Sequence, residues 1–142
     1  MGSMDRRTFL QAILGWISAG HVLTGLTLLS GRRGIGAGSV IYGAEFVPTE
    51  QFQVIIRPAG VYVLTMAYLQ AQAAREPERY RAVIDGTLGL FGVRLLQRTL
   101  FARQVQRTFG IAPARHWATT LYFAFLAGLL LAARAQFERE AA

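Results

Sequence analysis

Four apolar segments limit the folds open to this chain of 142 residues. They occupy about residues 9–29, 54–74, 82–101 and 116–135. Each holds about 20 residues, which is the length of helix needed to cross the hydrocarbon core of a bilayer. A soluble bundle would need a polar stripe on every helix, and the first and last segments have none of adequate width. The sequence therefore predicts an all-α fold, an integral membrane four-helix bundle that forms a single domain over residues 1–142.

The connections between these segments differ in character. Residues 30–51 are rich in glycine and predict a long, flexible extramembrane loop. Residues 75–81, REPERYR, form a tight charged link, so the second and third segments should be antiparallel neighbours. The third helix should continue past the membrane until Gly110 and Pro113 end it. Residues 136–142 should form a charged tail in solvent.

Charge and composition exclude several classes of site. The chain has no cysteine, which rules out disulfides, thiolate metal sites and cysteine nucleophiles. Its net charge is +7, and all 15 basic residues are arginine. These arginines lie at the ends of apolar segments, which is typical of contacts with lipid headgroups, so we expect membrane lipids and no nucleic acid as partners. Arginine counts on the two sides are nearly equal and leave the orientation open.

The N-terminus allows two interpretations. The leading Met-Gly-Ser is typical of a cloning scar. The following DRRTFLQ resembles a twin-arginine export signal, but no small-residue cleavage site closes the apolar run cleanly. An arginine anchor beside a first membrane span is the favoured interpretation.

The third segment carries charges that a membrane helix must neutralise. At 100° per residue, Arg94 and Arg98 share a face with Thr87 and Phe91, whereas Asp85 projects from the opposite side. Asp85 therefore cannot pair with the two arginines along the same helix. Either the arginines extend to lipid phosphates at the interface, or they face inward to a polar site or a partner.

Other residues are candidates for the same polar site or for helix contacts. Glu45 in the long connection is a possible counter-ion, and Arg57 should lie at the membrane rim. Small residues favour close helix packing in membranes. On this basis we expect internal helix contacts at Gly86, Gly89, Gly92, Gly15 and Ala19.

The two histidines raise the possibility of a cofactor. A haem held by two histidines needs both imidazoles facing the iron. His21 lies well inside the first segment, while His116 begins the last one, about 10 Å away in depth at 1.5 Å per residue. We therefore predict no cofactor and no metal site, with b-type haem or a chlorophyll at His21 as the alternative. No serine, histidine and acid occur at catalytic spacing, so we expect no catalytic residues.

The pattern as a whole resembles the small DoxX-like bacterial membrane proteins. The residues that carry the resemblance are RPAG at Arg57–Gly60, the REPERYR link, and VRLLQR at the end of the third segment. The resemblance implies four spans, a location in a bacterial inner membrane and, in some members, association with redox complexes. It supplies no catalytic residues.

Three functions remain open on the sequence. The leading hypothesis is an accessory, assembly or scaffold subunit that packs against a larger membrane complex, respiratory or photosynthetic, or against further copies of itself. The second is a carrier of small molecules or ions with a polar site at Asp85, Arg94 and Arg98. The third is a redox subunit that binds haem or a pigment at His21. An enzyme acting alone is the least supported.

Overall fold

The computed structural model describes residues 5–141, and the predicted cloning scar lies outside them. Within these residues the chain is all-helical, with six helices and no strand. The helices are α1 (Arg6–Leu29), α2 (Gly31–Tyr42), α3 (Glu50–Arg75), α4 (Arg81–Leu100), α5 (Ala102–Phe109) and α6 (Pro113–Ala141).

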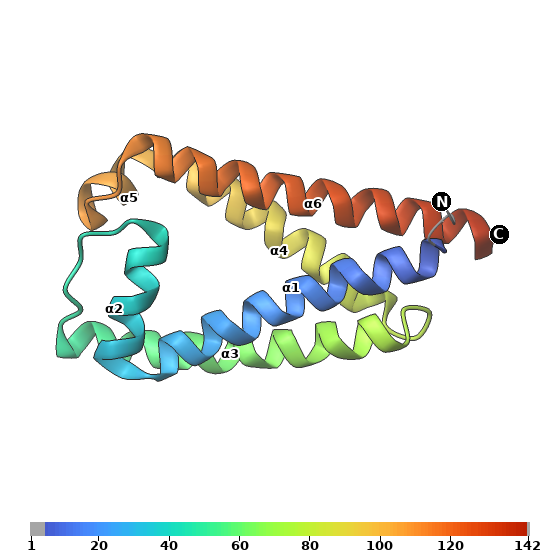
Figure 1. The fold of residues 1–142 in the computed structure, drawn as a ribbon, viewed down its shortest axis with the longest axis horizontal. Helices are drawn as coiled ribbons and strands as arrows, with labels where there is room; N and C mark the ends of the chain where they lie inside the picture. The colour runs from blue at the N-terminus through green and yellow to red at the C-terminus, as the bar shows by residue number, and fades with distance from the viewer. Residues whose placement is uncertain (1–4, 142) are drawn as a thin grey trace.

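The four long helices form two arms that diverge (Figure 1). One arm is α1 packed along α3, and the other is α6 with α4, which runs obliquely from the α3 side and meets α6 toward α5. The arms meet at the end that holds both chain termini, where α1 also contacts α6. At the opposite end they separate, and α2 lies in the opening between them.

The core follows the helical periodicity of the inward faces. In α1 the buried positions recur every three or four residues, at Leu10, Ile13, Leu14, Ile17, Ser18, His21 and Gly25. This spacing places them on a single stripe that faces the other helices. The α1 stripe meets Ile84 and Phe91 of α4, and Leu130 of α6 is fully buried in the same cluster.

Three of the helices are long and apolar enough to cross a membrane: α1, α3 and Pro113–Phe137 of α6. Their outward faces carry large apolar side chains, among them Ile55, Tyr62 and Leu121, each more than two-thirds exposed. Such surfaces suit contact with lipid rather than water. Helix α4 does not meet the same criterion because Arg81, Asp85, Arg94 and Arg98 fall within its 20 residues.

The prediction of a flexible loop over residues 30–51 is wrong for its first half, which forms α2. Gly31 and Gly43, both with positive φ, turn the chain into and out of this helix. The glycines within it serve close packing, because a Cβ on Gly38 would lie 2.6 Å from the Thr27 side chain of α1. A Cβ on Gly34 would lie equally close to the Thr27 carbonyl oxygen. Glycine here lets α2 fold back onto α1 and does not mark disorder.

The helix predicted for the third apolar segment, residues 82–101, also differs from expectation. It breaks at Phe101 into α4 and α5 instead of running unbroken, and the Thr99 hydroxyl bonds back to the carbonyls of residues 95 and 96 just before the break. Such back-bonding bends helices. Gly110 ends α5 with a positive φ, as predicted, whereas Pro113 is the first residue of α6, which begins three residues before the predicted start at His116. The residues of the predicted charged tail continue α6 as far as Ala141.

Candidate functional site

The inward face of α4 holds the polar residues that the sequence singles out. Thr87 and Phe91 are buried, and the arginine side chains that follow them on the same face are half-buried. Of the two orientations open to these arginines, the structure has the inward one: Arg94 lines a cavity between the arms, and Arg98 contacts α6.

A chain of buried hydrogen bonds joins α1, α3 and α4 behind this face. His21 Nδ1 lies 2.7 Å from Gln70 Oε1, and Gln70 Nε2 donates to Thr87 Oγ1 at 3.1 Å. The Thr87 hydroxyl donates in turn to the Val83 carbonyl at 2.8 Å. We call this set the His21–Gln70–Thr87 chain.

The donors of this chain fix the tautomer of the histidine. Because the Thr87 hydrogen is used on a carbonyl, Thr87 must accept from the amide of Gln70. The amide oxygen of Gln70 then faces His21 and can only accept. His21 Nδ1 therefore carries the proton, and in the neutral ring Nε2 carries the lone pair.

Arg98 and His116 hold the end of α4 against the start of α6. The Arg98 guanidinium donates to the His116 carbonyl at 3.0 Å and to Thr120 Oγ1 at 2.9 Å. His116 Nε2 lies 3.1 Å from the Arg98 carbonyl, to which it donates. The His116 ring is fully buried and its Nδ1 has no hydrogen-bond partner among the described residues. His116 thus clamps two helices together.

Arg94 has weaker partners. Its guanidinium carbon lies 4.1 Å from the centroid of the Phe123 ring, within cation–π range. Its hydrogen bond to the Tyr42 hydroxyl of α2 is long at 3.4 Å. Among the described side chains, no carboxylate lies within ion-pair distance of Arg94 or Arg98. Arg94 is therefore a half-buried cation without a counter-ion from the described part of the chain.

The remaining charged candidates lie elsewhere. Asp85 pairs with Arg134 of α6 at 2.8 Å on a half-exposed surface, where such a pair contributes about 0–1 kcal/mol. Glu45 is exposed, and its backbone N–H binds the Phe109 carbonyl at the α5 end. Arg57 is exposed beside the turn at Gly31. The structure does not bring these residues to the two arginines of α4, so a single polar site that includes Asp85 is not formed.

The predicted glycine contacts are wrong within this chain. Gly86, Gly89 and Gly92 are exposed, and a Cβ added to any of them would meet nothing within 4 Å. Gly15 and Ala19 of α1 are likewise exposed. The reason is rotational: α4 turns Thr87 and Phe91 inward, which directs the glycines outward.

The close helix contact is instead made by Gly25 of α1 and Gly60 of α3. A Cβ on Gly25 of α1 would lie 2.6 Å from Leu64 and 3.1 Å from the Gly60 carbonyl oxygen of α3. Their positions carry a usable signal, because Gly25 continues the stripe of Ser18 and His21 at intervals of three and four.

The histidines do not form a common site. His21 binds Gln70 and stacks near Phe91, whereas His116 binds the Arg98 backbone. Within residues 5–141 no group of three or more histidine or acidic residues could hold a metal ion.

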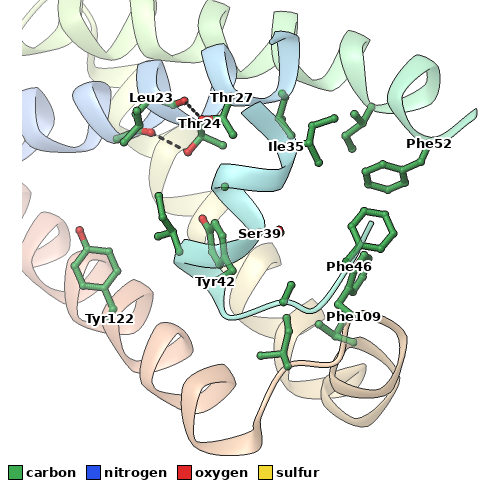
Figure 2. A pocket seen from close by; sticks show the side chains of 18 of the residues that line it. Leu23, Thr24, Thr27, Ile35, Ser39, Tyr42, Phe46, Phe52, Phe109 and Tyr122 are labelled. Carbon is green, nitrogen blue, oxygen red and sulfur yellow. Dashed lines mark hydrogen bonds between the residues drawn. The ribbon is translucent and has the colours of Figure 1, made fainter. Parts of the chain in front are cut away.

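Two neighbouring cavities lie between the arms. The larger, of about 650 Å³, is almost entirely apolar and is bounded by α1, α2, the start of α3, α5 and α6 (Figure 2). The smaller, of about 120 Å³, is lined by His21, Arg94 and Tyr42 among others. The sequence analysis did not foresee either cavity because it treated α2, which forms one wall, as a loop.

Comparison with known proteins gives no family assignment: no family model, curated protein or solved structure matches this chain. The resemblance to DoxX-like proteins therefore stays a prediction.

The His21–Gln70–Thr87 chain predicts a specific loss of stability. Gln70→Leu keeps the side-chain volume but leaves the imidazole N–H and the Thr87 hydroxyl without their amide partner in an apolar core. We expect the free energy of unfolding to fall by about 1–3 kcal/mol, measured by thermal unfolding in detergent. Gln72→Leu is the matched control, because the Gln72 side chain makes no hydrogen bond to the described residues. Equal stability of the two variants would contradict the assignment.

Proposed function

We propose that this chain is a small integral membrane subunit that docks through the outer face of α4 onto a transmembrane helix of a larger membrane complex. The outer face of α4 comprises Gly86, Gly89 and Gly92 together with Leu90, Val93 and Leu96. Three candidate spans within one short chain support residence in the membrane.

The observation that carries the proposal is the exposure of the three glycines. A Cβ at any of them would meet open space, so the chain itself does not use their small size. Without side chains at these points, a foreign helix can approach the α4 backbone closely, which is how helices associate in lipid.

The composition of α4 favours the same conclusion. It has four charged residues in 20 and is the least suited of the long helices to a lipid environment, yet Val93 and Leu96 on its outer face are more than half exposed. A neighbouring protein helix would cover this face and reduce the contact of α4 with lipid. We propose a helix of a different membrane protein as the partner, because the outer faces that α1, α3 and α6 of a second copy would offer carry bulky side chains such as Trp16, Tyr62 and Leu121.

We further propose that α4 crosses the membrane together with α1, α3 and α6. In Figure 1 both chain termini lie at one end of the molecule, and α4 runs obliquely from that end to the end that holds α5. Its side chains contact α6 through the Asp85–Arg134 ion pair and the Arg98–Thr120 hydrogen bond. Residence in a bacterial inner membrane and association with a redox complex rest on the resemblance to DoxX-like proteins alone.

The docking proposal predicts the effect of filling the glycine face. Gly89→Leu should release the chain from its partner complex, because the new side chain prevents close approach of the partner helix. The change should not unfold the chain, since the position is open and leucine favours a helix by up to about 1 kcal/mol over glycine. The measurement is co-purification from native membranes in mild detergent, with partners identified by mass spectrometry.

Gly128→Leu is the matched control for this experiment. Gly128 is an exposed glycine of α6 with nothing within 4 Å, and the variant should retain the complex. A wild-type chain that purifies without any partner contradicts the proposal. A chain found only with further copies of itself shows that the face is used but that the partner is not a different protein.

The four-span arrangement predicts which residues share a side of the membrane. The chain has no cysteine, so single cysteines can be placed and labelled in intact cells with an impermeant maleimide. Cysteines that replace Glu78 and Glu45 should be labelled from opposite sides of the membrane. A cysteine that replaces Arg107 should be labelled from the same side as the one at position 45. Labelling of positions 78 and 107 from the same side would show that α4 does not cross.

A further inference from the structure

The larger cavity has the form of a site for an apolar chain. Its wall carries Leu23 and Thr24 of α1 and Ile35 of α2, while Phe46, Phe52 and Phe109 gather at one end (Figure 2). These three rings pack edge to face, with the Phe46 centroid 4.9 and 5.3 Å from the other two. The volume of about 650 Å³ lies in the range of roughly 300–1,000 Å³ that small-molecule pockets occupy.

The smaller cavity supplies a polar end to this apolar space. The two cavities share five lining residues, so they are adjacent: Trp16, Gly20, Thr24, Tyr42 and Tyr122. At their common boundary the Trp16 indole donates to the Tyr122 hydroxyl at 3.0 Å. Beyond this boundary lie His21 and Arg94.

The charge at the polar end is not balanced by the described part of the chain. Arg94 is half-buried, and its contacts are an aromatic ring and one long hydrogen bond to an uncharged hydroxyl. A cation held inside an apolar bundle is expected to meet an anion or a strong acceptor. The cavity is the place from which such a group can reach it.

The histidine adds a second requirement. The His21–Gln70–Thr87 chain leaves Nε2 as the nitrogen with a lone pair, and His21 lines the smaller cavity. A ligand head that suits both residues must accept from a guanidinium and offer a proton to an imidazole. A carboxyl group does both: its proton passes to His21 Nε2, and the carboxylate that remains accepts hydrogen bonds from the Arg94 guanidinium.

We propose that the space between the arms binds a long-chain fatty acid. The carboxyl head lies in the smaller cavity against Arg94 and His21, and the acyl chain lies in the larger cavity toward the phenylalanine cluster at Phe46. The apolar lining of the larger cavity favours an acyl chain, and Arg94 favours an acidic head group. This binding site lies between the arms, on the opposite side of α4 from the docking face, and does not depend on it.

The test uses the full chain in phosphatidylcholine nanodiscs with a palmitate probe that carries a diazirine on its acyl chain. On irradiation the probe should label residues of the larger cavity, found by peptide mass spectrometry. Labelling should saturate, and palmitate should compete for it while the uncharged alcohol hexadecanol should not. Arg94→Gln should weaken labelling about tenfold or more, which corresponds to the loss of one charge-assisted hydrogen bond. Arg103→Gln, at an exposed arginine of α5, should leave it unchanged.

A second pair of variants tests the cavity without altering charge. Gly20 lines both cavities and has open space at its Cβ, so Gly20→Leu should fill the passage between them and abolish labelling while the helix is kept. Gly15→Leu, at an exposed α1 glycine that lines neither cavity, should retain it.

Three results would overturn the proposal. Competition by hexadecanol as strong as that by palmitate would show that the acid is not recognised. Labelling that survives Gly20→Leu would place the probe outside the cavities. Equal labelling by a diazirine phospholipid, insensitive to Arg94→Gln, would show that bilayer lipid fills the space instead of a free fatty acid.

Discussion

The arrangement of the helices depends on one buried hydrogen-bond chain, His21–Gln70–Thr87. Burying any of these polar groups in an apolar bundle costs free energy unless the group has a hydrogen-bond partner. Only one rotation of α1, α3 and α4 about their axes brings the three groups together. That rotation turns Thr87 and Phe91 inward. It thereby directs Arg94 toward the smaller cavity between the arms and the three glycines away from it.

The cavities follow from the way the two arms are joined. At one end the arms pack through an aliphatic core, where Leu10 and Leu130 are fully buried. At the other end α2 lies between them, held against α1 by glycines that admit Thr27. Because α2 is short, it closes only part of the opening, and the apolar space that remains ends at Arg94. The same geometry thus provides both a half-buried cation and a compartment beside it.

Local patterns predicted much of this fold from the sequence. The helix end at Gly110 follows from the ease with which glycine adopts a positive φ, and the helical character of the apolar segments and the shared face of Arg94 with Thr87 follow from a periodicity of 3.6 residues. The direction of that face does not. The sequence around Gly89 does not indicate whether this glycine faces another helix of the same chain or another protein. Likewise, the sequence around Gly34 is compatible with both a loop and a tightly packed helix. Only the positions of the other helices, set by tertiary contacts such as Gln70 to His21, decide between them.

Determining the tautomer of His21 tests the central claim most directly, because the tautomer depends on every donor in the His21–Gln70–Thr87 chain that orients α4. The measurement is the one-bond nitrogen–hydrogen coupling of the His21 ring by NMR, in ligand-free protein labelled with ¹⁵N and held in detergent. The account predicts a proton on Nδ1, hydrogen-bonded to Gln70, and a lone pair on Nε2. A ring with its proton on Nε2 and a bare Nδ1 would contradict it.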